Sequence, residues 1–265
     1  MATATSAAHS TLSARRPLIF FFGLCYAISW PCWLLALLLD GSLRTVVIVV
    51  GGFGPAVAAA VTIRRSGGSL REWAGRIVRW RAPIRYWLYA LGLPLLIMLG
   101  MNVSLAALGQ QPAWTSLLDR VPGYLQTLLL TAVVFGGQEE PGWRGFALPR
   151  LQSRHSPMVA TLILGLGWGI WHVPLYGPAG FVVPLVLAFF YSWLVNKTGS
   201  VLLCILLHAG FTAAQDHLLL TADSPVVDVV LLGSYLAGAL IIIATTRGRL
   251  GLRPDQPPGV EERKA

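Results

Sequence analysis

The sequence predicts an all-α membrane protein, a polytopic bundle of about eight transmembrane helices with both termini in the cytoplasm. Of the 265 residues, 55% are hydrophobic and only 12% are charged, which is outside the range of ordinary soluble domains. A helix needs about 20 mostly apolar residues to cross a bilayer. Eight segments approach that description: Leu18–Leu39, Val46–Ile63, Trp87–Leu108, Tyr124–Leu148, Pro157–Tyr176, Val182–Asn196, Gly199–Leu220 and Val226–Thr246.

Basic residues are concentrated in every second loop between these eight segments, on the side that the positive-inside rule assigns to the cytoplasm. Arg15 and Arg16 precede the first segment, and seven arginines between positions 64 and 85 follow the second. Only Arg44 and Arg120 fall in the alternate loops, whereas a seven-span model would break the alternation. The net charge of +9 is therefore explained by topology, and we expect the lipid bilayer and no nucleic acid as a partner.

The chain reads as one membrane domain. Its first apolar run, about 22 residues long, exceeds the apolar region of a cleaved signal peptide, so we expect an uncleaved first span. The three cysteines lie inside expected spans and indicate neither a disulfide scaffold nor a thiolate metal site. We predict a cytoplasmic tail over residues 1–16, a membrane domain over 17–247 and a second cytoplasmic tail over 248–265.

Two further patterns concern packing. Between the second and third spans, Leu70, Trp73 and Ile77 recur at helical spacing, with arginines on the other faces. This predicts an amphipathic helix on the cytoplasmic surface that anchors the chain, with recruitment of substrate or lipid as the alternative. In the second span, the small residues of GGFGPAVAAA, residues 51–60, permit close approach of helices.

Ionisable residues at membrane depth are costly and mark a candidate functional site. Glu140 and Arg144 are four residues apart, so on a helix they share a face and are predicted to form an ion pair. Glu139 lies about 100° around that helix, where Trp143 covers its face and no basic partner is available. A buried carboxylate without a cation suits a general base or acid near neutral pH.

Two histidines lie at comparable depth on later spans. The helical rise places Glu139, His208 and His172 about 15, 13 and 22 Å below the cytoplasmic face, so the three can meet in one buried pocket and activate a water. Thr212 and Gln215 follow His208 by four and seven residues, near the same face. The alternative is that each histidine only hydrogen-bonds across helices.

Three motifs at these positions resemble the CPBP family of intramembrane proteases, which includes the type II CAAX prenyl endopeptidases and bacterial Abi or bacteriocin-immunity proteins. They are EExxxR at Glu139, Glu140 and Arg144, FxxxH with tryptophan in the first place at Trp168 and His172, and HxxxN with threonine in the last place at His208 and Thr212. The resemblance covers a core of about residues 121–220. It implies a helical membrane fold and proteolytic activity.

The resemblance also implies roles for these residues. Glu139 would be the general base, acting with His172 and His208 on the attacking water. Glu140 and Arg144 would form an orienting pair, and Trp143 and Trp168 would support the site or contact the substrate.

The threonine in the third motif is a departure. The family asparagine would hold the water or stabilise the tetrahedral intermediate, and loss of such a donor can cost about 10²-fold in rate. Thr212 keeps one hydroxyl donor, and Gln215 is the alternative. Glu139, His172 and His208 also have the ligand types of a divalent metal site such as zinc. We favour a site without tightly bound zinc.

The expected function is hydrolysis of a peptide bond in a membrane-associated or lipidated protein or peptide, prenylated or unmodified, in a bacterial inner membrane. A non-catalytic scaffold or bacteriocin-immunity protein of the same fold is the alternative, favoured by Thr212. A proton-coupled transporter is less favoured, because repeat-related broken helices are not evident.

Overall fold

The computed structural model describes residues 2–252, and side chains from Pro17 onward except that of Ala179. Regular structure within residues 2–252 is helical throughout, which confirms the all-α prediction. The predicted C-terminal tail lies mostly outside the described residues. The elements are α1 (Ala2–Ala36), α2 (Gly41–Gly52), α3 (Gly54–Arg65), α4 (Leu70–Ile77), α5 (Ile84–Ala107), η1 (Trp114–Ser116), α6 (Leu117–Val133), η2 (Gly137–Glu139), α7 (Glu140–Gly142), η3 (Trp143–Ala147), α8 (Leu148–Gln152), α9 (Pro157–Tyr176), η4 (Pro178–Phe181), α10 (Val182–Thr198), α11 (Val201–Leu218) and α12 (Pro225–Thr245).

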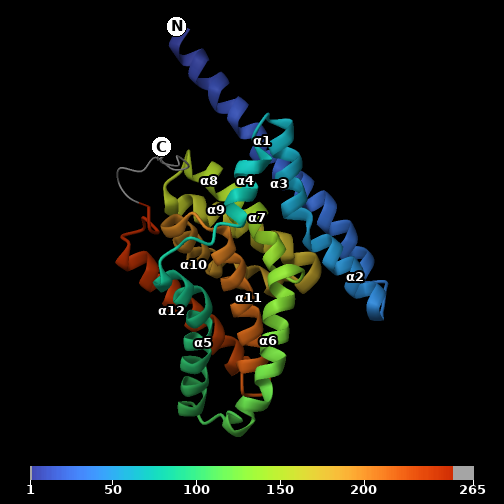
Figure 1. The fold of residues 1–265 in the computed structure, drawn as a ribbon, viewed down its shortest axis with the longest axis vertical. Coiled ribbons are helices and arrows are strands. Elements are labelled where there is room, and N and C mark those ends of the chain that lie inside the picture. The colour runs from blue at the N-terminus through green and yellow to red at the C-terminus, as the bar shows by residue number, and fades with distance from the viewer. Residues whose placement is uncertain (1, 253–265) are drawn as a thin grey trace.

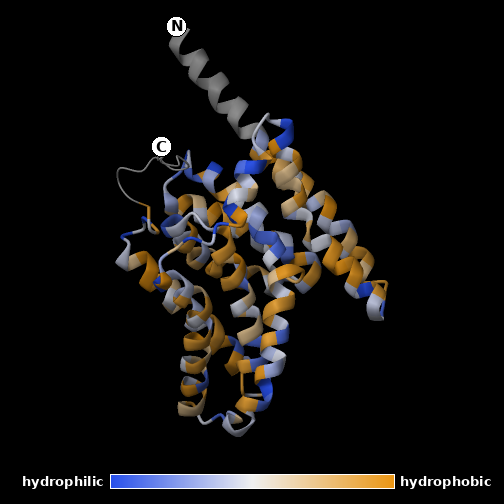
Figure 2. Ribbon diagram, viewed as in Figure 1, coloured by the Kyte–Doolittle hydropathy of each residue, from blue (hydrophilic) through white to orange (hydrophobic). Residues whose placement is uncertain are grey.

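Within the described residues, six helical segments are long and apolar enough to cross a membrane. They are α1 from Pro17, α2 together with α3, and then α5, α9, α11 and α12, which correspond to six of the eight expected spans. Hydrophobic residues extend along α1, α2 and α5 in Figure 2. The sixth expected span corresponds to α10, which is apolar but has 17 residues.

The fourth expected span, Tyr124–Leu148, is not one continuous helix, and this corrects the sequence prediction. Helix α6 ends at Val133, and Gly136 follows with a φ of +149°, where an L side chain would be strained. Pro141 lies in the first turn of α7 and does not bend a continuous helix. A π-helical turn, η3, then leads into α8. The two glutamates therefore lie at a break, residues 134–147, which we call the broken segment.

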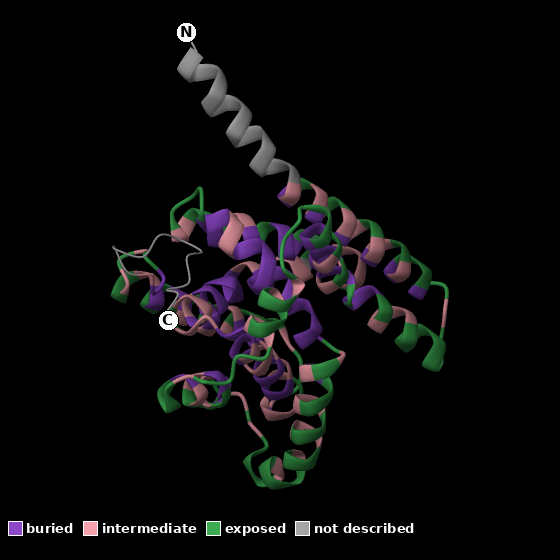
Figure 3. Ribbon diagram, turned by 45° about the horizontal axis from the view of Figure 1, so that its top comes forward, coloured by how far each residue is buried: buried purple, intermediate pink, exposed green. Residues whose placement is uncertain are grey.

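The helices pack around α11. It lies between α5 and α6 in Figure 1 and also contacts α10 and the broken segment. Helix α1 lies beside α2 and α3, which follow one another end to end along one flank, coloured in shades of blue in Figure 1. In Figure 3, buried residues gather in the centre of the molecule, while the outer faces of the peripheral helices are exposed. From Gly136 to Ala147 the broken segment is buried, which lets irregular backbone exist at membrane depth.

The small residues of the second span pack closely, as predicted. A Cβ atom built on Gly52 would lie 2.6 Å from Nε2 of Gln138, and one built on Gly142 would collide with the carbonyl of Pro55. Both contacts join the α2–α3 hinge to the broken segment. Glycines on each side therefore set how closely the second span approaches the candidate site.

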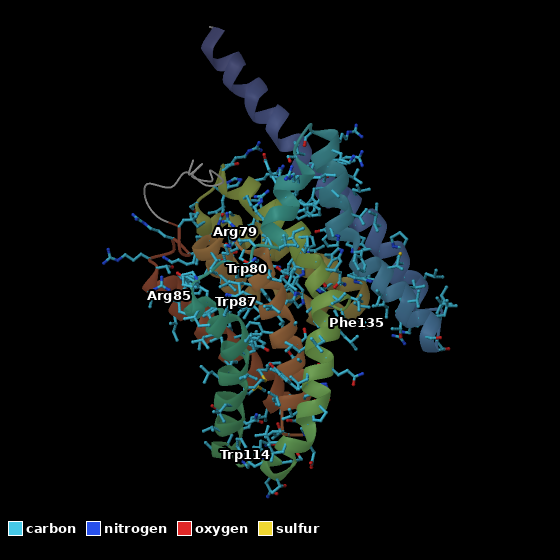
Figure 4. All side chains as sticks on the ribbon, viewed as in Figure 1. Arg79, Trp80, Arg85, Trp87, Trp114 and Phe135 are labelled. Atoms are coloured by element: carbon cyan, nitrogen blue, oxygen red, sulfur yellow. The ribbon has the colours of Figure 1, made fainter. Side chains whose placement is uncertain are left out.

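Helix α4 forms where the amphipathic pattern predicts it, with the hydroxyl of Ser69 capping its first turn. Nε1 of Trp73 donates a hydrogen bond of 3.0 Å to the carbonyl of Pro141. The helix thus holds the broken segment as well as presenting arginines outward. In Figure 4, Trp80, just after α4, lies toward the end of the molecule opposite to Trp114.

Candidate active site

The break before the glutamates is closed by a buried glutamine. Oε1 of Gln138 accepts a hydrogen bond of 2.7 Å from the Gly136 amide, and its Nε2 donates one of 2.8 Å to the Val134 carbonyl. These bonds replace helical hydrogen bonds that the break removes. The sequence prediction did not include Gln138, although a third polar side chain beside two glutamates in an apolar stretch is the signal that could have found it.

The predicted ion pair between Glu140 and Arg144 is present. Nη1 of Arg144 lies 3.0 Å from Oε1 of Glu140, and both side chains are fully buried. The guanidinium also lies 4.1 Å from the ring centre of Trp168 and 4.3 Å from that of Tyr191. These aromatic faces stabilise the buried cation. Tyr191 was not predicted, because a tyrosine inside the apolar run of α10 has the appearance of packing.

His208 contacts Glu140, whereas the sequence prediction directed it toward Glu139. Its Nδ1 lies 2.8 Å from Oε1 of Glu140, so one carboxylate oxygen serves both His208 and Arg144. An ionised carboxylate only accepts hydrogen bonds, which assigns the ring hydrogen to Nδ1 and makes Nε2 the acceptor in the neutral ring. A Cβ built on Gly136 would lie 2.6 Å from that Nε2, so the break leaves room for the imidazole.

Glu139 is buried, and its partner comes from the next membrane helix. Oε2 of Glu139 accepts a hydrogen bond of 2.8 Å from Nε1 of Trp168, and the residue is 6% exposed. Trp143, which the sequence predicted to cover the face of Glu139, has aromatic neighbours from α1 and α9. Its ring packs edge-on against Phe21 and Trp171, with ring centres 5.5 and 5.7 Å away.

His172 lies one turn beyond Trp168 on α9 and is also buried. Its Nδ1 lies 3.0 Å from the carbonyl oxygen of Trp168, which can only accept, so Nδ1 carries the hydrogen and Nε2 is the acceptor of the neutral ring. The imidazole packs between Trp33 and Tyr176, with ring centres 6.3 and 5.6 Å from its own. Both histidines therefore offer Nε2 for chemistry.

Trp168 brings the predicted residues together. Its ring centre lies 5.5 Å from that of His172 and 5.7 Å from that of His208, and its Nε1 binds Glu139. One carboxylate and two imidazoles from three parts of the chain thus surround a single indole. This cluster can orient a water molecule and exchange a proton with it.

The remaining predicted residues lie along α11. Thr212 follows His208 by one turn and is partly buried. Oε1 of Gln215 accepts a hydrogen bond of 3.3 Å from the hydroxyl of Tyr235, which ties Gln215 to α12. Of the two candidate substitutes for the family asparagine, Thr212 is thus one turn from His208, and Gln215 has a partner outside the cluster.

The arrangement of these side chains can be compared with the divalent metal site that the sequence suggested at Glu139, His172 and His208. Among the side chains that the structure describes, no group of three or more His, Cys, Asp or Glu residues is arranged to hold a metal ion. Glu139 instead binds an indole, and His208 binds a second carboxylate. Glu139, His172 and His208 are therefore not arranged as a group of three metal ligands in this structure.

The part of the chain that contains Glu139, His172 and His208 is similar to known proteins. Residues 121–214 match the family model described as type II CAAX prenyl endopeptidase Rce1-like. Over 134 residues the chain is 32% identical to CAAX prenyl protease 2 of Methanococcus maripaludis. That match covers 44% of this chain and 48% of the relative, so the chain spans about half the length of the relative it matches.

Proposed function

We propose that this protein is an intramembrane endopeptidase, of the kind that the match over residues 121–214 describes, and that it cleaves a peptide bond with a water activated by Glu139. The observation that carries the proposal is the buried cluster of Glu139, His172 and His208 around one indole. Apolar helices surround the cluster, so its substrate is a membrane-associated protein or peptide. We place the protein in a bacterial inner membrane.

The proposed reaction uses groups of this chain. One hydrogen of the attacking water is accepted by the Glu139 carboxylate and the other by Nε2 of an imidazole, which directs the oxygen toward the substrate carbonyl carbon. Attack forms the new C–O bond as the π bond of the carbonyl breaks, which gives a tetrahedral oxyanion. One proton of the water passes to Glu139, while the second hydrogen stays on the attacking oxygen and only hydrogen-bonds to Nε2. Glu139 then returns its proton to the amide nitrogen as the C–N bond breaks, and the carboxylate is regenerated.

Glu140 and Arg144 support this chemistry indirectly. Arg144 neutralises Glu140, and Glu140 holds Nδ1 of His208. This chain of contacts fixes the tautomer and direction of the imidazole, in the way that a carboxylate orients the histidine of other hydrolytic sites. Thr212, one turn along α11, supplies the remaining hydroxyl donor near the reacting carbonyl.

The proposed substrate class is taken from the name of the matched relative. The matched relative is named as a CAAX prenyl protease, and we propose that this chain cleaves a lipidated peptide of that type or an unmodified membrane peptide. A non-catalytic scaffold or immunity protein of the same fold is the second candidate, because Thr212 replaces the asparagine of the third motif.

The test is cleavage of farnesylated and unmodified membrane peptides by the purified chain in liposomes. Glu139→Gln removes the proposed base and should abolish cleavage, whereas Glu72→Gln, on the exposed face of α4, should leave it intact. Dialysis against a chelator should leave the rate unchanged, since the cluster does not fit a metal site. Full activity of Glu139→Gln would overturn the proposal, and no cleavage of either peptide by the wild-type chain would favour the scaffold.

A further inference from the structure

Trp168 makes more contacts with the site than its position in an apolar helix suggests. It is 2% exposed, and its indole Nε1 donates to Glu139 while its backbone carbonyl holds Nδ1 of His172. The face of the same ring lies 4.1 Å from the guanidinium carbon of Arg144. Trp168 thus touches Glu139, the proposed base, and His172. It also contacts Arg144, the cation that pairs with Glu140 and so supports the second imidazole.

The hydrogen bond to Glu139 has a defined direction. An indole N–H can donate and cannot accept, so Oε2 of Glu139 is the acceptor. A donor aimed at a buried carboxylate stabilises the ionised form more than the protonated form. It also holds one oxygen of the carboxylate, so Oε1 is the oxygen that the proposed reaction would use to accept from the water.

The three contacts of Trp168 can be separated by substitution. The bond to His172 uses the backbone carbonyl and survives any change of side chain. The face against Arg144 is retained by phenylalanine, which has an aromatic ring of its own. Trp168→Phe removes the N–H donor to Glu139 and places a smaller aromatic ring against His172 and His208. Phenylalanine is also the residue of the family motif at this position, so the donor is a departure of this chain from that motif.

We propose that Trp168 is a positioning residue whose indole N–H orients the Glu139 carboxylate and holds it in the ionised form required of a general base. This inference rests on the proposed function of Glu139. It predicts that the enzyme stays active at lower pH than it would with phenylalanine at this position. It further predicts that loss of the N–H affects the chemical step and leaves substrate binding unchanged.

The first experiment is a pH–rate profile of Trp168→Phe in liposomes. The lost donor serves a charged group, so its loss should move the acidic limb upward by about one pH unit or more. At pH values on that limb kcat should fall at least tenfold, with KM unchanged. Trp171→Phe is the matched control, because Trp171 is buried on the same helix and its Nε1 has no hydrogen-bond partner within the described structure.

An acidic limb that coincides with that of the wild type would overturn the inference, as would a uniform fall in kcat at every pH. An equal shift in Trp171→Phe would also overturn it, since that change removes no donor from Glu139.

A second experiment does not depend on cleavage or on the folding of the Trp168 variant. In protein labelled with ¹⁵N-tryptophan, the Nε1–H resonance of Trp168 should titrate with pH in the wild type and become insensitive to pH in Glu139→Gln. A Trp168 resonance that does not titrate, or that titrates equally in Glu139→Gln, would overturn the hydrogen bond. If the resonance behaves as expected while no peptide is cleaved, the proposed function fails and the contact stands.

Discussion

Gly136 offers the sharpest test of the broken segment, since it combines an unusual backbone angle with a close contact. Its φ of +149° is one that residues with a Cβ atom rarely adopt. An alanine Cβ there would lie 2.6 Å from Nε2 of His208, whereas ordinary contact begins at 3.4 Å. The imidazole must therefore retreat by about 0.8 Å, the difference between those two distances, or the backbone must change.

Both consequences can be given a magnitude. The strained backbone should cost about 1–3 kcal/mol of stability. A retreat of the imidazole moves Nε2, the nitrogen proposed to face the water, and a misplacement of about 1 Å in a catalytic constellation can cost about 10²-fold in rate. We therefore expect Gly136→Ala to lower kcat by about 10²-fold and to lower the melting temperature.

The assay is cleavage of the peptide that the wild type cleaves best, with thermal unfolding followed in the same detergent. Gly92→Ala is the control, because a Cβ at Gly92, in the middle of α5, meets nothing within 4 Å. It should retain the wild-type rate. If Gly136→Ala keeps kcat within about twofold of the wild type, the close contact that links the break to His208 does not exist in the protein.

Two further substitutions test the contacts around the broken segment, with the exposed Trp80→Phe as a control that should change little. Glu140→Gln leaves the buried Arg144 without its counter-charge and should destabilise the protein by about 3–5 kcal/mol. The melting temperature should fall, and an unchanged melting temperature would contradict the buried pair. Trp73→Phe removes the donor to the Pro141 carbonyl and should lower the stability of the broken segment by about 0.5–1.5 kcal/mol. Amide hydrogen exchange in that segment should be faster than in Trp80→Phe, and an equal rate would contradict the contact.

Local spacing was sufficient for part of the site. Glu140 and Arg144 are four residues apart, and this contact persists although the chain passes from α7 into a π-helical turn between them. The amphipathic helix at Leu70–Ile77 was likewise predictable, because its pattern repeats over two full turns. Features that depend on neighbours within one turn can be read from residue types alone.

The partners of Glu139 and His208 could not be predicted in the same way. The stretch Tyr124–Leu148 was interpreted as one continuous helix, so the break between α6 and η2, just before Glu139, was not predicted. Hydropathy also treats tryptophan as apolar, which conceals the N–H that Trp168 donates. Contacts between α9, α11 and the broken segment join distant parts of the chain, and spacing within one helix carries no information about them.

The break also has a consequence for how the protein is made. Glu139, Glu140 and Arg144 lie within six consecutive residues, and a charged residue at the centre of an isolated helix costs about 2.5–3.5 kcal/mol on insertion. Their stabilising partners, Tyr191 and His208, belong to α10 and α11, which emerge later from the ribosome. A nascent chain that ends before α11 therefore has a polar segment without its partners and an incomplete catalytic cluster. With the proposed function, proteolytic competence would begin only after synthesis has passed α11, the helix that carries His208.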